Sequence, residues 1–208
     1  MATDFELLDA WRAGDRMAGN ELFDRYFDSL FRFFRNKVSE GADDLVQQTF
    51  LACVQSRDRF RGDASFRTYL FKAARSKLYT YLDKRRREGA AIDYGVTSCA
   101  DLGVSPSGIV AKNEQQRVLL AALRLLPVDL QVALELYYFE HIRGPELAEV
   151  LGVPEGTVRS RLRRGREILR ERLQELMRSP DMVESTMTDL EAWAAALREH
   201  VLGPGGGE

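Results

Sequence analysis

The sequence predicts an all-α protein with two small helical domains, a linker between them and a short amphipathic helix near the C-terminal end. Two observations predict this fold class. Long segments repeat apolar residues at spacings of three and four, and no segment alternates apolar with polar residues as a strand would. The 208 residues are 45% hydrophobic and 30% charged, which is ordinary globular composition for one or two domains.

The first domain is expected over residues 1–88. Thr3 and Glu6 form a capping-box pattern that opens a short helix. A stripe at helical spacing, assigned to the core of a second helix, comprises Leu22, Phe23, Tyr26, Phe27, Leu30, Phe31, Phe34 and Val38. A third helix begins near Asp43, and its expected packing residues are Leu45, Val46, Phe50, Leu51 and Val54. Ser65 is the expected N-cap of a fourth, long helix that ends in a basic run from Lys84 to Arg87.

Residues 89–112 have mixed polarity, several glycines and no sustained period, which predicts a linker. The second domain is expected over residues 113–178, where the helical period resumes and is broken around Pro127. Residues 179–208 form an extension with one short amphipathic helix, and its final glycine-rich residues are expected to be disordered. Two interpretations of this extension stay open: packing against the second domain, or restraint of activity through the chain's own domains or a partner.

The segment "GPELAEVLGVPEGTVRSRL" has the pattern of a helix-turn-helix. Leu147 and Leu151 lie on one face of a first helix, and Gly152 suits the left-handed residue that ends it. Pro154 suits the start of the next helix, and Val158 would pack back against the first. In this motif the N-terminal half of the second helix enters the DNA major groove.

Arginines cover the remaining faces of this second helix. Ordinary solvated ion pairs with neighbouring glutamates are one interpretation of the pattern. DNA binding is the other, because arginine can contact guanine edges or phosphates. The net charge of −2 is unexpected for a free-standing DNA-binding protein, but basic residues are segregated into two stretches, at 72–87 and 159–172. Such a chain would bind DNA weakly alone and depend on a larger partner.

Several classes of protein and site are not expected. The chain has no apolar run of membrane-spanning length and no signal-peptide pattern, so we expect a cytoplasmic protein without membrane insertion. Cys53 and Cys99, like His141 and His200, match no metal-ligand spacing; one buried cysteine and one linker thiol are expected. With no nucleophile, general base or metal pattern, the sequence predicts no enzyme, no metal site and no cofactor.

Two blocks of sequence carry a family resemblance. "DDLVQQTFLACVQSRDRFRGDASFRTYLFKAARSKL" resembles region 2 of the extracytoplasmic-function (ECF) sigma factors of the sigma-70 family. "LRLLPVDLQVALELYYFEHIRGPELAEVLGVPEGTVRSRLRRGREIL" resembles their region 4. The resemblance runs from about Gly14 to Leu176 and implies that the first domain is a region 2 bundle of three or four helices and the second a region 4 helix-turn-helix.

The resemblance also implies roles for individual residues. For docking on the clamp helices of the largest polymerase subunit, it implies Asp44, Leu45, Gln47 and Gln48. For the promoter −10 element, it implies Phe60, Arg61, Asp63, Lys72, Arg75, Ser76 and Lys77. For the −35 element, it implies Arg159, Ser160, Arg163 and Arg164. Core packing is the alternative for Phe60, and helix capping the alternative for Asp43. Ser76 replaces the asparagine common in the family, which puts the −10 preference in doubt.

The implied function is that of an RNA polymerase specificity subunit. Region 4 would read the −35 element as duplex, while region 2 would open the −10 element and trap one strand. The implied partners are core RNA polymerase, through its clamp helices and the flap of its second subunit, together with promoter DNA and an anti-sigma factor. The alternative is a stand-alone helix-turn-helix transcriptional regulator, which would not need the region 2 block. An anti-sigma or adaptor protein would need no pair of arginine-rich helices that face DNA.

Overall fold

A computed structural model describes residues 2–56, 65–85, 92–103, 114–177 and 179–200. In that part of the chain the regular structure is helical, with an isolated bridge between Ser98 and Pro127 and no strand, so the predicted all-α class is confirmed. The helices are α1 (Asp4–Arg12), α2 (Arg16–Arg35), α3 (Ala42–Ser56), α4 (Phe66–Arg85), α5 (Glu114–Arg124), α6 (Val128–Tyr138), α7 (Gly144–Leu151), α8 (Glu155–Leu176), α9 (Pro180–Thr188) and α10 (Leu190–His200).

Local signals in the sequence set several helix ends. The Thr3 hydroxyl accepts from the backbone N–H of Glu6, whose carboxylate accepts from the N–H of Thr3, so the capping box forms. Ser65 Oγ accepts from the N–H of Thr68 at 3.1 Å, as expected of an N-cap. Gly152 ends α7 in the left-handed conformation with φ of 65°, which glycine adopts without steric penalty. The connection between α7 and α8 is therefore the predicted turn.

Helices α1 to α4 build the first half of the molecule around an aromatic core. Gly19 in α2 permits a close crossing with α1, since a Cβ there would lie 2.6 Å from Trp11 Cδ1. Leu30 and Phe34 of α2 are fully buried, as is Phe71 of α4. The core prediction was wrong for three residues: 41% of Phe27, 55% of Leu51 and 38% of Val54 is exposed.

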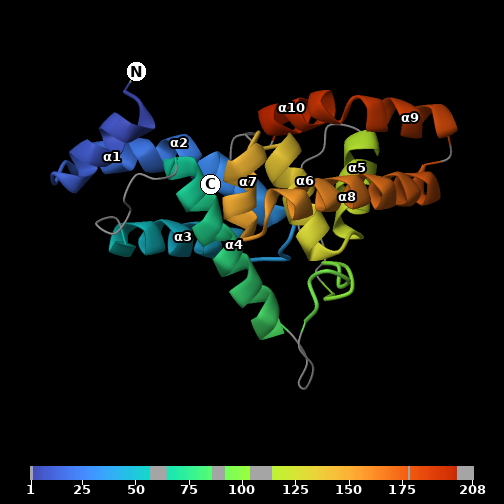
Figure 1. The fold of residues 1–208 in the computed structure, drawn as a ribbon, viewed down its shortest axis with the longest axis horizontal. Coiled ribbons are helices and arrows are strands. Elements are labelled where there is room, and N and C mark those ends of the chain that lie inside the picture. The colour runs from blue at the N-terminus through green and yellow to red at the C-terminus, as the bar shows by residue number, and fades with distance from the viewer. Residues whose placement is uncertain (1, 57–64, 86–91, 104–113, 178, 201–208) are drawn as a thin grey trace, which may run out of the picture.

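A second apolar cluster lies among α5, α6, α8, α9 and α10. Its buried members include Leu134 of α6, Leu169 of α8, Met187 of α9 and Leu197 of α10. Figure 1 shows α9 and α10 along one side of the second half, where α9 packs on α8 and α10 on α6. The extension is therefore part of the second domain's core, which agrees with the packing interpretation.

The core of the first half continues into the second half. Helix α7 packs directly against α4 (Figure 1), and apolar residues of α6, α7 and the first turn of α8 join the same cluster. Those with at most 4% exposure are Val128, Val132, Ala133, Leu136, Leu147, Val150, Leu151 and Val158. The two halves thus form one packed body and are not separated by the segment between them.

The described part of the expected linker, residues 92–103, is folded against both halves. The ring of Tyr94 stacks on that of Tyr79 with centroids 4.3 Å apart, and the backbone N–H of Val128 donates to the carbonyl of Thr97. Cys99 is fully buried, as is Cys53, so neither thiol lies on an open linker. Burial raises the pKa of Cys53 to about 12 and that of Cys99 to about 11, which keeps both thiols protonated and weakly nucleophilic at neutral pH.

Candidate nucleic-acid interface

Helices α7 and α8 form the helix-turn-helix that the sequence predicted. Val158, in the first turn of α8, is 4% exposed and belongs to the same cluster as Leu147 and Leu151 of α7. This packing fixes α8 against α7 on one side. The N-terminal half of α8 then presents its other side to solvent, as a recognition helix must.

All four residues expected to read the −35 element are exposed on α8. The side chains of Arg159 and Arg163 keep 77% and 76% of their accessible surface. Arg163 Nη1 lies 3.1 Å from Glu167 Oε1, and Arg159 lies 3.9 Å from Glu155. Ser160 Oγ donates to the carbonyl of Gly156 at 3.1 Å. Exposed ion pairs of this kind are weak, so the arginines can exchange their glutamate partners for DNA at little cost.

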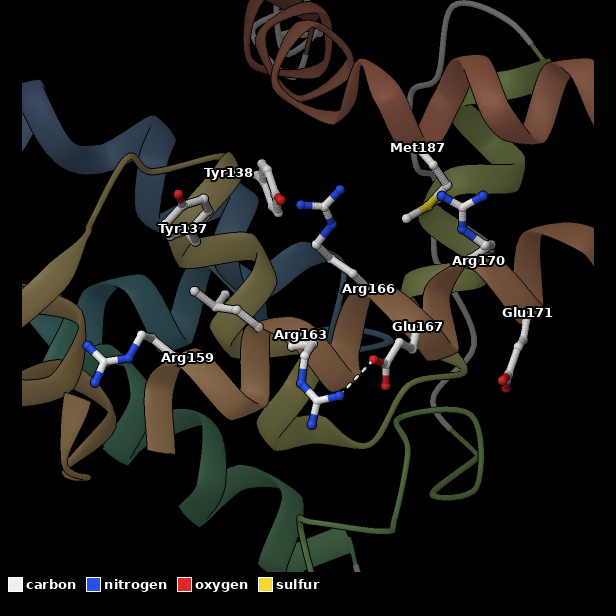
Figure 2. Close-up of a pocket in the computed structure, with 10 residues that line it drawn as sticks. Tyr137, Tyr138, Arg159, Arg163, Arg166, Glu167, Arg170, Glu171 and Met187 are labelled. Carbon is white, nitrogen blue, oxygen red and sulfur yellow. Dashed lines mark hydrogen bonds and ion pairs between the residues drawn. The ribbon is translucent and has the colours of Figure 1, made fainter. Parts of the chain in front are cut away.

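A groove of about 640 Å³ runs between α8, α6 and α9 beside this face. Figure 2 shows Arg159, Arg163, Arg166 and Arg170 along it, at spacings of four, three and four residues, which place them on one side of α8. Arg166 lies near Tyr138 and opposes the burial that raises the pKa of that phenol. The basic stripe therefore continues past the four predicted residues, and the helical spacing of the arginines could have indicated this.

Gly165 lies on the buried side of α8, opposite the arginines. A Cβ at this position would be 3.1 Å from Cδ1 and Cγ of Leu134. The glycine lets α8 approach α6 closely, which positions the recognition helix on its support.

The described −10 residues lie on α4. Lys72 is exposed, and its ammonium lies 3.4 Å from Glu149 Oε1 of α7. The guanidinium carbon of Arg75 sits 4.5 Å from the ring centroid of Tyr79. Ser76 is exposed and Lys77 half-buried. The other three predicted residues, Phe60, Arg61 and Asp63, lie outside the described residues.

The expected polymerase-binding residues come from the first two turns of α3. Asp44, Gln47 and Gln48 are exposed together, whereas Leu45 is 4% exposed and packs in the core. Leu45 therefore supports this face from below and is not on its surface. The exposed Leu51 follows Gln47 by one turn, and Val54 is exposed three residues further along the same side of α3. An apolar patch thus continues the polar one, which sequence reasoning missed because it assigned these side chains to the core.

Two negative findings concern the described ranges alone. Within them no three His, Cys, Asp or Glu side chains are grouped so that they could hold a metal ion. None of the helices there combines the length and apolarity that a bilayer crossing requires.

Comparison with known families places both halves. Residues 22–88 match the family model described as sigma-70 region 2, and residues 116–169 match the one described as sigma-70 region 4. Together the two matches cover more than half of the chain. They coincide with α2 to α4 and with the segment from α5 into α8.

Relatives and solved structures agree with these matches. The ECF RNA polymerase sigma-E factor of Haemophilus influenzae is 29% identical over 184 residues, which is 84% of this chain and 97% of that protein. The sigma-E factor of Escherichia coli is 28% identical over 185 residues, covering 85% and 97%.

In fold, the chain is similar to CnrH in its complex with the cytosolic domain of CnrY, with a TM-score of 0.59, 22% identity and coverage of 81% of this chain and 96% of that one. It is also similar to RpoE of Bartonella quintana in complex with the anti-sigma factor NepR, with a TM-score of 0.53, 24% identity and coverage of 70% and 90%. The two family matches occur in the expected order, the alignments cover almost the whole length of the relatives, and the fold agrees with both. The chain is therefore a member of the ECF sigma factors of the sigma-70 family.

Proposed function

We propose that this chain binds core RNA polymerase and directs it to promoters by reading two separate DNA elements. The observation that carries this proposal is the presence, in one chain, of a region 4 helix-turn-helix with an exposed arginine face and a region 2 bundle with its own basic helix. A stand-alone helix-turn-helix regulator would account for α7 and α8 and leave region 2 without a purpose.

The division of labour follows the helices. Residues 1–88 bind polymerase and capture the −10 strand, residues 89–112 connect the two halves, and residues 113–178 read the −35 duplex. Within the extension 179–208, helices α9 and α10 complete the second core. On α8, the contacts to bases and phosphates come from Arg159, Ser160, Arg163 and Arg164. For the −10 element, the contacts come from α4 and the segment that precedes it in sequence: Phe60, Arg61, Asp63, Lys72, Arg75, Ser76 and Lys77.

The polymerase-binding surface is the exposed face of α3. Asp44, Gln47 and Gln48 supply polar contacts to the clamp helices of the largest subunit, and Leu51 and Val54 add apolar area next to them. Region 4 contacts the flap of the second subunit. An anti-sigma factor is a further partner, by analogy with the RpoE–NepR complex. The polymerase carries out the chemistry, so this chain acts in the cytoplasm as a specificity subunit and not as a catalyst.

Trapping the −10 strand requires bases to leave the duplex, at a cost of a few kcal/mol that binding must offset. The net charge of −2 is compatible with this function, because the polymerase supplies much of the affinity for DNA. The proposal is tested by mixing the purified chain with core polymerase and measuring complex formation by gel filtration. Co-elution that Gln47→Ala/Gln48→Ala weakens would support it, and separate elution of the wild-type chain would refute it.

A further inference from the structure

One face of α4 is covered by the second half of the chain. Thr68, Lys72, Arg75 and Tyr79 follow one another at spacings of four, three and four residues, so they lie on one side of the helix. This side faces α7 and the start of α6. It includes two of the residues to which we assign −10 binding, Lys72 and Arg75.

The residues of α7 and α6 that contact this face of α4 include three carboxylates. Glu149 of α7 pairs with Lys72 at 3.4 Å, and Glu146 of α7 accepts from the Thr68 hydroxyl at 3.3 Å. At the start of α6, Asp129 accepts from the Tyr79 hydroxyl.

Arg75 and Arg67 complete this arrangement. Arg75 reaches the turn after α7, where a Cβ on Gly152 would lie 3.9 Å from its Nη1. Just before α7, Glu140 lies between Arg67 of α4, at 3.4 Å, and Arg32 of α2, at 3.5 Å. A row of acidic groups thus lies along the basic helix, as the phosphates of a bound strand would.

Apolar packing holds the covering segment in place. Leu147, Val150 and Leu151 of α7 are at most 1% exposed and share a core with Phe71 and Ala74 of α4. The polar contacts at the rim are different in kind, because Lys72 and Glu149 keep 56% and 44% of their side-chain surface. Exposed pairs contribute little to stability, so their main effect is to occupy and screen the basic groups.

The same arrangement leaves the other DNA-reading face open. Arg159, Ser160, Arg163 and Arg164 of α8 are all exposed. The two promoter-reading faces are therefore unequal in the free chain: the region 4 face is accessible and the region 2 face is screened.

We propose that the α7 segment acts as a built-in mimic of the DNA backbone that shields the −10-binding face of α4 until the two halves separate. This inference rests on the proposed function, which supplies the role of α4. Glu146 and Glu149 occupy the sites of phosphates, and the halves must come apart before α4 can bind a strand. Core polymerase, which binds both halves, drives this separation.

The experiment measures the separation of the halves directly. Spin labels are attached at Asn20→Cys in α2 and Ala192→Cys in α10, both exposed, while the native cysteines are buried. Electron–electron double resonance then gives the distance distribution. We expect a single short distance in the free chain and a longer one when Glu146→Lys/Glu149→Lys places positive charges beside Thr68 and against Lys72. An unchanged distance distribution in this variant would overturn the inference.

A matched control separates position from charge. Glu114→Lys/Glu175→Lys makes the same change in net charge at two exposed sites whose partners, Arg117 and Arg172, belong to the second half. The control should keep the short distance. The interface variant should bind labelled single-stranded DNA several-fold more tightly than the control. The slope of log K against log salt should steepen by about 0.7 for each additional phosphate contact. Equal affinity in the two variants would contradict shielding.

A second measurement needs no substitution at the interface. Adding core polymerase to the doubly labelled wild-type chain should lengthen the distance, and a distance that stays short in a demonstrated complex would overturn the inference. If no complex forms, the proposed function fails, while the free-chain measurements still decide whether α7 shields α4. In transcription with saturating polymerase, the interface variant should equal the wild type. A deep loss there, in a folded variant, would make the two glutamates part of the active complex and not a shield.

Discussion

The ammonium of Lys37 donates to the carboxylate of Glu135, although the two residues lie 98 positions apart, in opposite halves of the chain. Lys37 has no exposed surface, and its ammonium also donates to the carbonyl of Phe33 at 2.6 Å. Asn36 and Gln131 donate to the other oxygen of Glu135, at 2.8 and 2.9 Å. This buried network joins the turn after α2 to the middle of α6, next to the apolar contact between the halves.

Removing one partner of this pair leaves a buried charge without its counterion. We expect Lys37→Met and Glu135→Leu each to lower the free energy of unfolding by about 3–5 kcal/mol. The double variant should lose much less than the sum, since two apolar side chains then fill the site. Urea unfolding of the four proteins in a double-mutant cycle measures this coupling. Additive losses would show that the two side chains do not depend on each other.

Glu140 provides a pH test. Burial raises the pKa of this carboxyl above its usual 4.5, although Arg32, Arg67 and Ser29 oppose the shift. A carboxyl whose pKa is raised by folding contributes stability below its unfolded pKa and loses that contribution as the pH rises through the folded pKa. The advantage of wild type over Glu140→Gln should therefore shrink as the pH rises from about 4.5 toward neutrality. Unfolding measured across this range would contradict the assignment if the advantage grew instead.

Gly19 tests the crossing of α1 and α2. Gly19→Ala would place a Cβ 2.6 Å from Trp11 Cδ1 and 2.7 Å from Nε1, so the indole must move. We expect a loss of about 1–3 kcal/mol from overpacking, which exceeds the helix propensity that alanine gains. Gly156→Ala in α8 is the matched control, because no atom lies within 4 Å of its new Cβ. Thermal unfolding should separate the two variants, and equal stabilisation of both would rule out the close contact.

Arg163 tests the recognition face. Arg163→Ala should weaken promoter use by about 1–3 kcal/mol and relax the preference at one position of the −35 element. Its ion pair with Glu167 is exposed, so stability should hardly change. Arg117→Ala, which removes another exposed arginine, from α5, should leave transcription unchanged. A loss of activity without any change in the selected −35 sequence would reassign Arg163 to a phosphate contact.

Much of the architecture was predictable because the residues that start, cap and end a helix lie close together in the sequence. The capping box at Thr3, the N-cap at Ser65 and the left-handed Gly152 all use signals within a few residues, and all three form. The exposed arginines of α8 were predictable for the same reason, since Val158 defines the buried side of that helix.

Relations between distant segments were not predictable. Periodicity shows which side of a helix is apolar but not whether another element covers it, so Leu51 was assigned to the core although it is exposed. The role of Gly165 becomes visible only from its close contact with Leu134 of α6. The screening of Lys72 likewise depends on Glu149 of α7, which is distant in the sequence. The contact between the halves depends on residues many positions apart, for which a single sequence carries no signal.

The central claim is that this chain gives polymerase its choice of promoter. The most direct measurement is transcription in vitro with purified core polymerase, this chain and a pool of random promoter-like DNA, followed by sequencing of the transcribed templates. We predict transcripts that start at a fixed distance downstream of a two-part motif, and none when the chain is omitted. A polymerase that binds the chain yet selects no common motif from the pool would contradict the claim.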